Sequence, residues 1–199
     1  MSYTNFKFVD LEKHFALRQA QKQLFDTTQI AQIQPSNWLL ESLEIAQSLP
    51  LLNIKAKSTY IIAPILAEIL RKQQHKIQLF SGENLDGDKK AKLNGEVDYI
   101  IACYPQAMEL RDPIITISAA KKSDIIGGLS QCAAQMYGAR LFNKKAENDI
   151  EKIYGIVTSG LDWHFLCLED QTIFIDTQTY TIGNLPQVLG ILNWIVEQY

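Results

Sequence analysis

Apolar residues recur along the chain with two spacings, and each spacing predicts one kind of element. After Ser58 they come at intervals of three and four residues, which is typical of an amphipathic helix. The members of this stripe are Ile62, Ile65, Leu66, Ile69 and Leu70. Pro64 lies inside the pattern, and because proline has no N–H to donate, it predicts a kink or a late helix start.

Two later stretches also show helical spacing. The longer one covers residues 124–143, where Gly127 and Gly128 weaken the first turn or let another backbone approach closely. The last one covers residues 185–198, and Asn184 precedes it as a capping residue. Both stretches are long enough to cover a sheet with one apolar face.

Shorter apolar runs predict strands. Before the long helix they lie at residues 76–80, 97–103 and 114–119, and the stretch between the first two is rich in turn-forming residues. After the long helix they lie at residues 153–158, 163–168 and 172–176. Only short turns separate these last three runs, so we expect them to form a meander.

The first fifty residues are more polar. Residues 7–24 are interpreted as a weakly amphipathic helix, followed by a loop over residues 25–35. Ser36 is a suitable N-cap for a second helix over residues 37–48, which Pro50 ends. We therefore expect an N-terminal helical extension, residues 1–50, attached to a main domain, residues 51–199.

The order of these elements indicates an α/β protein. Helices come first, then strands, a long helix, more strands and a last helix, which predicts a central mixed β-sheet flanked by helices in two or three layers. A chain of 199 residues fits one such domain with an appended segment.

Composition narrows the possible functions. The net charge of -3 gives no support for a dedicated nucleic-acid coat, although lysines cluster locally, as at residues 89–92 and at Lys121 and Lys122. Three distant cysteines form no disulfide framework or zinc motif. With no signal peptide and no apolar run of about 18 residues, we expect a cytoplasmic protein without membrane contact.

Candidate chemistry is concentrated between residues 79 and 143. One strand ends in Ser-Gly-Glu at residues 81–83, the next opens with Gly-Glu-Val-Asp at residues 95–98, and a third ends in Ser-Ala-Ala-Lys-Lys at residues 118–122. The long helix then carries Gln131 and Gln135 one turn apart. Metal-dependent phosphodiester cleavage needs carboxylates to hold Mg²⁺ and a cation beside the phosphate, and an acid two residues before a lysine would lie on the same face of a strand.

These motifs, in this order, resemble the PD-(D/E)XK nuclease superfamily. The resemblance runs from about residue 55 to residue 194, and it is most specific to small bacterial proteins, frequent in cyanobacteria, with a restriction-endonuclease-like core. It includes LNGEVD at residues 93–98, AAKKSD at 119–124 and GLSQCAAQM at 128–136. It implies a restriction-endonuclease-like fold, Mg²⁺ or Mn²⁺ as cofactor and DNA as partner. Asp98 matches the first metal-binding acid, Lys121 the lysine, and Gln131 the glutamine of the following helix.

The chain departs from the family pattern at two positions. Ala119 stands where similar proteins have the second acid, and Thr59 stands where many have a glutamate at the start of the first core helix. Ala119 is either an engineered replacement or a native loss. A migrated acid is a third explanation: Glu83 is the favoured stand-in, Glu68 lies far along its helix, and Glu96 is expected on the opposite face of its strand from Asp98.

Three functions are compatible with these residues. The first is a metal-dependent DNA endonuclease in which Asp98 and Glu83 hold the metal, Lys121 stabilises the developing charge and Gln131 orients it. The second is an inactive nuclease fold retained for DNA binding, or for assembly with a protein partner or with a second copy. In the third, the task lies on the N-terminal extension.

Overall fold

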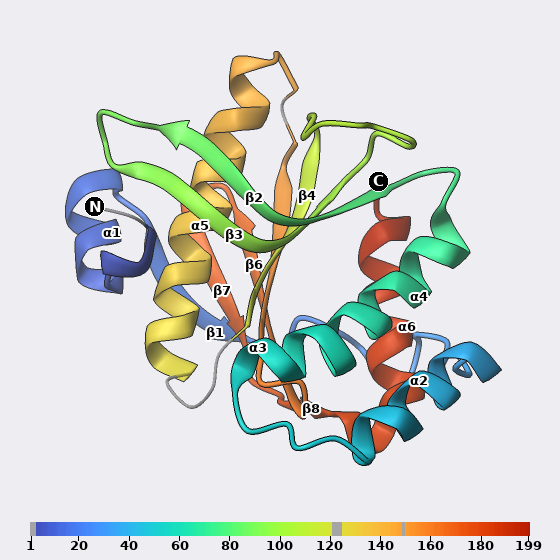
Figure 1. Cartoon of the computed structure of the whole chain (residues 1–199). Coiled ribbons are helices and arrows are strands. Elements are labelled where there is room, and N and C mark those ends of the chain that lie inside the picture. Colours follow the sequence, from blue (N-terminus) through green and yellow to red (C-terminus); the bar gives the residue numbers. More distant parts are fainter. Residues whose placement is uncertain (1–2, 121–124, 149) are drawn as a thin grey trace.

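The core of the protein is a mixed sheet flanked by helices, as the sequence predicts, and it has eight strands, of which the sequence predicts six (Figure 1). The computed structural model describes residues 3–120, 125–148 and 150–199, with residues 116–120 described by their backbone. The strand order is β1-β7-β6-β5-β4-β3-β2, and β8 pairs with β6. The strands are β1 (Arg18–Lys22), β2 (Gln78–Asp88), β3 (Leu93–Ala102), β4 (Ile114–Ala120), β5 (Lys152–Thr158), β6 (Asp162–Glu169), β7 (Thr172–Asp176) and β8 (Tyr180–Thr181).

Two pairs of strands in this sheet are parallel. β4 pairs with β5, and β1 pairs with β7, while the other neighbours are antiparallel. Parallel strands require a crossover connection, and α5 (Ile125–Lys145) supplies it between β4 and β5. The antiparallel pairing of β5, β6 and β7 confirms the predicted meander.

Helices cover both faces of the sheet, so the protein has three layers (Figure 1). On one face lie α5 and α1 (Phe8–Phe15), whose apolar side chains share a core with the sheet. On the other face lie α2 (Asn37–Gln47), α4 (Ala63–Gln73) and α6 (Leu185–Glu197). Within the described residues, no helix combines the length and the apolar character needed to cross a bilayer.

The first core helix begins late, which is one of the two outcomes that Pro64 predicts. A short helix, α3 (Ile54–Lys57), passes through a π-helical turn, η2 (Ser58–Ile62), before α4 begins at Ala63. Pro64 therefore falls in the first turn of α4, where the missing N–H has no intrahelical partner to lose.

The N-terminal segment is built into the sheet, and the prediction of one helix over residues 7–24 is wrong in its second half. α1 ends at Ala16, which has a left-handed conformation with φ of 56°, and Arg18–Lys22 then form the edge strand β1. Four of its five residues are exposed, so the sequence of this strand has no alternation of apolar and polar residues from which it could be predicted. Tyr3 is buried, and its hydroxyl contacts the carbonyl oxygens of Leu85 and Leu93 at 3.1 and 3.0 Å.

Strands β2 and β3 are longer than predicted and form a hairpin that reaches over α5 (Figure 1). The turn-rich stretch thus belongs mostly to the two strands. Its glycines explain the difference: Gly82 has φ of 70°, and Gly87 packs backbone to backbone against α5. A Cβ atom on Gly87 would lie 2.5 Å from the Cα atom of Gly138.

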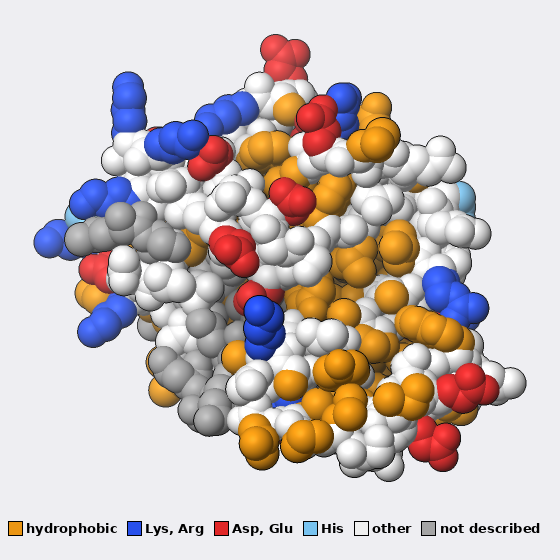
Figure 2. All heavy atoms as spheres, in the orientation of Figure 1, with side chains coloured by type: hydrophobic (Ala, Val, Ile, Leu, Met, Phe, Trp, Pro, Cys, Tyr) orange, Lys and Arg blue, Asp and Glu red, His pale blue; other side chains and the backbone are white. Residues whose placement is uncertain are grey.

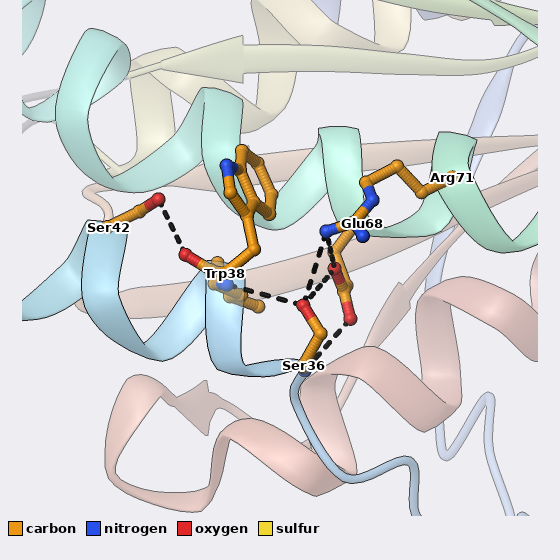
Figure 3. Close-up of polar contacts among 6 residues, drawn as sticks. Ser36, Trp38, Ser42, Glu68 and Arg71 are labelled. Atoms are coloured by element: carbon orange, nitrogen blue, oxygen red, sulfur yellow. Dashed lines mark hydrogen bonds and ion pairs between the residues drawn. The ribbon is translucent and has the colours of Figure 1, made fainter.

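Glu68 fastens α2 to α4 (Figure 3). Its side chain is buried, and its carboxylate accepts hydrogen bonds from the backbone N–H and the hydroxyl of Ser36, at 3.0 and 2.8 Å. Arg71 lies 3.5 Å from the same carboxylate. Ser36 in turn accepts the N–H of Leu39 and caps α2, as the sequence predicts. The buried carboxylate of Glu68 therefore has a structural explanation.

Replacing Glu68 by alanine is expected to lower the free energy of unfolding by about 2 kcal/mol, because charge-assisted bonds are lost and the Ser36 N–H is left unpaired. Urea denaturation followed by circular dichroism measures this change. The matched control is Glu44→Ala, an exposed change on α2, expected to cost less than about 0.5 kcal/mol. Equal, small effects of the two substitutions would contradict this role.

Candidate active site

The pairing of β3 with β4 brings Asp98 and Ala119 to neighbouring positions. In this antiparallel register Tyr99 is opposite Ser118 and Ile100 is opposite Ile117. This register ends at Tyr99 and Ser118, and the next residues beyond it on the two strands are Asp98 and Ala119. The first acid of the resemblance and the position of the missing second acid thus lie on adjacent strands. Lys121 lies outside the described residues.

The residues that flank Asp98 lie on different faces of the sheet. Tyr99 points to the α4 side, where its hydroxyl lies 2.7 Å from the hydroxyl of Ser58 and donates to the Ser58 carbonyl oxygen at 3.0 Å. Burial raises the pKa of Tyr99. Ile100 belongs to the core on the α5 side. Val97, the other neighbour of Asp98, also belongs to the core on the α5 side, so the alternation of side chains along β3 is interrupted at the half-buried Asp98.

Thr59 lies away from this face. It is exposed, and its hydroxyl donates to the carbonyl oxygen of Lys55 one turn earlier, at 3.0 Å. A threonine in a helix commonly makes this local bond. The position at which many similar proteins have a glutamate is therefore filled here by a residue whose hydroxyl bonds within its own helix.

Gln131 and Gln135 are both buried on the face of α5 that meets the sheet. The Gln135 amide nitrogen lies 3.5 Å from the Glu96 carbonyl oxygen. Three residues later, Gly138 packs against Gly87 near the end of the hairpin. Going from Gly138 through Gln135 toward the N-terminus of α5 therefore follows β3 in the direction of Asp98. One helical turn, about 5.4 Å, matches two strand residues, about 6.6 Å, so Gln131 lies at the level of Asp98.

Gln135 also carries a buried acceptor without a partner. Its side chain is fully buried, and its Oε1 atom has no hydrogen-bond partner. Buried polar atoms are nearly always paired, so an orphaned oxygen beside β3 requires an explanation. Sequence reasoning noted the spacing of the two glutamines and assigned a role to Gln131, but burial alone identifies Gln135 as unusual.

Three glutamates were considered as stand-ins for the missing acid, and the structure separates them. Glu68 has the structural role described above. Glu83 is exposed and lies opposite Val97 in the β2–β3 register. The expectation that Glu96 faces away from Asp98 stays a prediction, because Val97 and Tyr99, also two residues apart, lie in different cores and regular alternation does not hold here. The Glu96 Oε1 atom lies 3.8 Å from where a Cβ atom on Gly82 would be, and Gly82 is opposite Asp98.

The residues of this face can accommodate Mg²⁺ or Mn²⁺. Mg²⁺ prefers oxygen ligands and keeps several waters, so one or two carboxylates with a nearby amide oxygen suffice. Asp98 is one such carboxylate, and the orphaned Gln135 oxygen is an unmet acceptor on α5. Within the part of the chain that the structure describes, no group of three acidic, histidine or cysteine residues gathers. The fit is therefore to a weakly held cation.

Two surface hollows lie away from Asp98. One, of about 850 Å³, is formed by α1 and the end of the β2–β3 hairpin, and its lining includes Phe6, Phe15, His14, Lys90 and Lys92. Figure 2 shows Lys and Arg side chains gathered over this part of the molecule. The other, of about 880 Å³, lies across the sheet against α2 and has a mostly apolar lining with acidic residues at its edge.

Comparisons with known proteins identify no relative of this chain. No family model, curated protein or solved structure matches this chain. The candidate site is therefore judged on its own residues and on the arrangement of the strands that carry them.

Replacing Gln135 by methionine is expected to leave the free energy of unfolding unchanged or to raise it by up to about 1 kcal/mol, because it removes an unpaired buried oxygen at similar volume. Thermal or urea unfolding measures this effect. The matched comparison is Asn143→Leu on the same helix. Asn143 exchanges two 2.8 Å hydrogen bonds with the backbone of Ile114, so this change is expected to cost about 2 kcal/mol. A large loss of stability in Gln135→Met would show that its amide is structural.

Proposed function

We propose that this chain is a nuclease-like domain of the PD-(D/E)XK type that hydrolyses phosphodiester bonds in DNA with a divalent metal ion, at a rate limited by Ala119. The observation that supports the proposal is the antiparallel pairing of β3 with β4, whose register, continued one residue beyond Tyr99↔Ser118, leads to Asp98 and Ala119. Gln131, buried on α5, is the helix glutamine of the resemblance. This order of acid, second position and helix glutamine agrees with the arrangement that the resemblance implies.

Each residue has a distinct task in this proposal. Asp98 contributes a carboxylate that holds Mg²⁺ or Mn²⁺, and the bound cation would lower the pKa of a water and neutralise charge on the phosphate. Gln131 is buried beside β3 and orients the ligands through its amide. The resemblance assigns Lys121 to the charge that develops on phosphorus. Ala119 removes a ligand, which weakens cation binding and leaves Lys121 without an anionic neighbour.

Restoring the acid should increase cleavage. Supercoiled plasmid incubated with Mg²⁺ or Mn²⁺ is expected to be nicked slowly by the unaltered chain and at least roughly tenfold faster by Ala119→Glu, because a further ligand holds the cation. Gel electrophoresis of nicked and supercoiled DNA gives the rates.

The Asp98→Asn change, alone and combined with Ala119→Glu, is the control for this cleavage assay. Both variants are expected to fall to the background rate, since the first metal ligand is lost. If the unaltered chain and Ala119→Glu both leave single- and double-stranded DNA uncut in either metal, hydrolysis is the wrong assignment.

A second candidate function is DNA binding without cleavage. The hollow at the end of the hairpin favours it, because lysines stand beside two aromatic rings there: the centroids of Phe6 and Phe15 are 5.9 Å apart. Lysines neutralise backbone phosphates, and aromatic faces stack on unpaired bases. The exposed Lys90 would contribute to an electrostatic binding surface on a chain whose net charge is acidic.

Binding of this kind has a characteristic salt dependence. Lys90→Ala is expected to weaken DNA binding and to reduce the slope of log K against log salt concentration by roughly 0.7 to 0.9, the value for one phosphate contact. Fluorescence anisotropy with a labelled oligonucleotide measures both. Lys72→Ala, an exposed change on α4 across the sheet, is the control and should leave the slope unaltered. Equal effects of the two changes would rule out a specific surface at the hairpin.

A further inference from the structure

We propose that the hollow against α2 is the surface on which a second copy of this chain docks, so that the protein forms a symmetric dimer. This association is separate from DNA cleavage and does not depend on it. In the dimer, each copy inserts the apolar side chain of Leu52 into the hollow of the other. The lysines that follow Leu52 in the sequence then pair with glutamates at the edge of that hollow.

The α2 hollow has two walls built from distant parts of the chain. Residues of α2 form one wall, among them Leu40 and Leu43. Ile61 of η2, Leu161 of the turn between β5 and β6, and Leu185 at the start of α6 belong to the other. The volume of about 880 Å³ leaves room for side chains of another molecule between these apolar walls.

Apolar side chains at the α2 hollow are exposed to solvent. Leu40 and Leu161 in its lining are 49% and 45% exposed, and Leu52, which follows the lining residue Leu51, is 80% exposed. Figure 2 shows apolar side chains gathered over α2 and over the segment that leads from α2 to α3. Apolar side chains that gather in one exposed patch are typical of an interaction surface.

The charges at the α2 hollow restrict what can occupy it. Among the described residues of its lining, the charged ones are Glu41 and Glu44, and both are exposed on α2. No salt bridge to either glutamate is found in the part of the chain that the structure describes. Complementary charges favour association, so the occupant is expected to combine apolar side chains with basic ones.

Residues 52–57 of the same chain have this combination. The exposed Leu52 is followed by Lys55 and Lys57, which belong to α3. Neither lysine forms a salt bridge within the described residues. A second copy of the chain therefore supplies the apolar and basic segment that the α2 hollow requires.

The lysines lie beside the wall that faces α2. A Cβ atom on Gly160 would be 3.6 Å from the Cβ atoms of both Lys57 and Ile61, and Ile61 lines the α2 hollow. The surface thus has its acidic side chains on the α2 wall and its basic side chains next to the opposite wall.

This separation of charge makes the surface complementary to itself. In a two-fold interface, a contact of one residue with another is repeated with the two copies exchanged. A two-fold axis between the two sets of charges therefore brings the lysines of each copy to the glutamates of the other. The alternative, in which the glutamates of both copies face each other, is disfavoured by repulsion.

Sedimentation velocity of the whole chain over a wide range of protein concentrations tests the proposal. The unaltered chain is expected to form dimers. Leu52→Asp introduces a charge into the apolar hollow and should raise the dissociation constant at least roughly tenfold. The matched control is Met108→Asp, at a fully exposed side chain between β3 and β4, which should change the constant by no more than about twofold. Circular dichroism checks that each variant is folded.

Charge reversal tests whether the occupant is a second copy. One variant combines Glu41→Lys with Glu44→Lys, and the other combines Lys55→Glu with Lys57→Glu. Each variant alone should associate at least roughly tenfold more weakly than the unaltered chain, because like charges then face each other in both halves of the interface. An equimolar mixture of the two should recover dimers with one copy of each, which a fluorescent label on one variant detects.

The proposal is wrong if the unaltered chain is monomeric at every concentration. It is also wrong if Leu52→Asp and Met108→Asp have equal effects, because the dimer then uses another surface. Failure of the two charge-reversed variants to associate when mixed would contradict the pairing of lysines with glutamates. A monomeric chain that binds a synthetic helical peptide of leucine and lysine, in a manner that depends on Glu41 and Glu44, would assign the α2 hollow to a different basic partner and overturn the second copy.

Discussion

The close approach of α5 to the β2–β3 hairpin is the constraint on which the site depends. Gly87 and Gly138 meet backbone to backbone, and a Cβ atom on Gly138 would clash with the Tyr3 ring. This contact holds the hairpin over the helix. It thereby fixes how far Gln135 lies from β3 and which part of the strand Gln131 faces. The parallel pairing of β4 and β5 adds the second constraint, because it requires α5 to cross this face of the sheet.

Buried polar residues fall into two groups once their partners are known. Asn143 and Glu68 have their bonds satisfied by backbone groups or side chains, and each joins two elements of the fold. Gln135 differs because its oxygen remains unpaired in the core. An unpaired buried oxygen lowers stability, and such a group is explained by strain, by a catalytic role or by an ordered water or ion. The contrast directs attention to β3 and away from Glu68.

Periodicity predicted the strands of the meander and the helices of both layers because their apolar residues face a core. It missed β1, whose residues are exposed and whose conformation comes from pairing with β7. The strands that it predicted for β2 and β3 are too short. Glycines such as Gly82 are typical of turns, although here they lie within the hairpin. The sequence placed Asp98 and Ala119 on neighbouring strands. The burial of Gln135 could be found only in the structure.

The most direct test is to locate a bound cation. Paramagnetic Mn²⁺ added to isotopically labelled protein broadens the NMR signals of nearby amides. The account predicts that the amides of Gly82, Glu96 and Asp98 lose intensity first, with those of Gly183 and other residues near α6 unaffected. It also predicts that Asp98→Asn greatly reduces the effect. Broadening centred on the acidic edge of α2, or none at Asp98 at any Mn²⁺ concentration, would contradict a cation site on this face of the sheet.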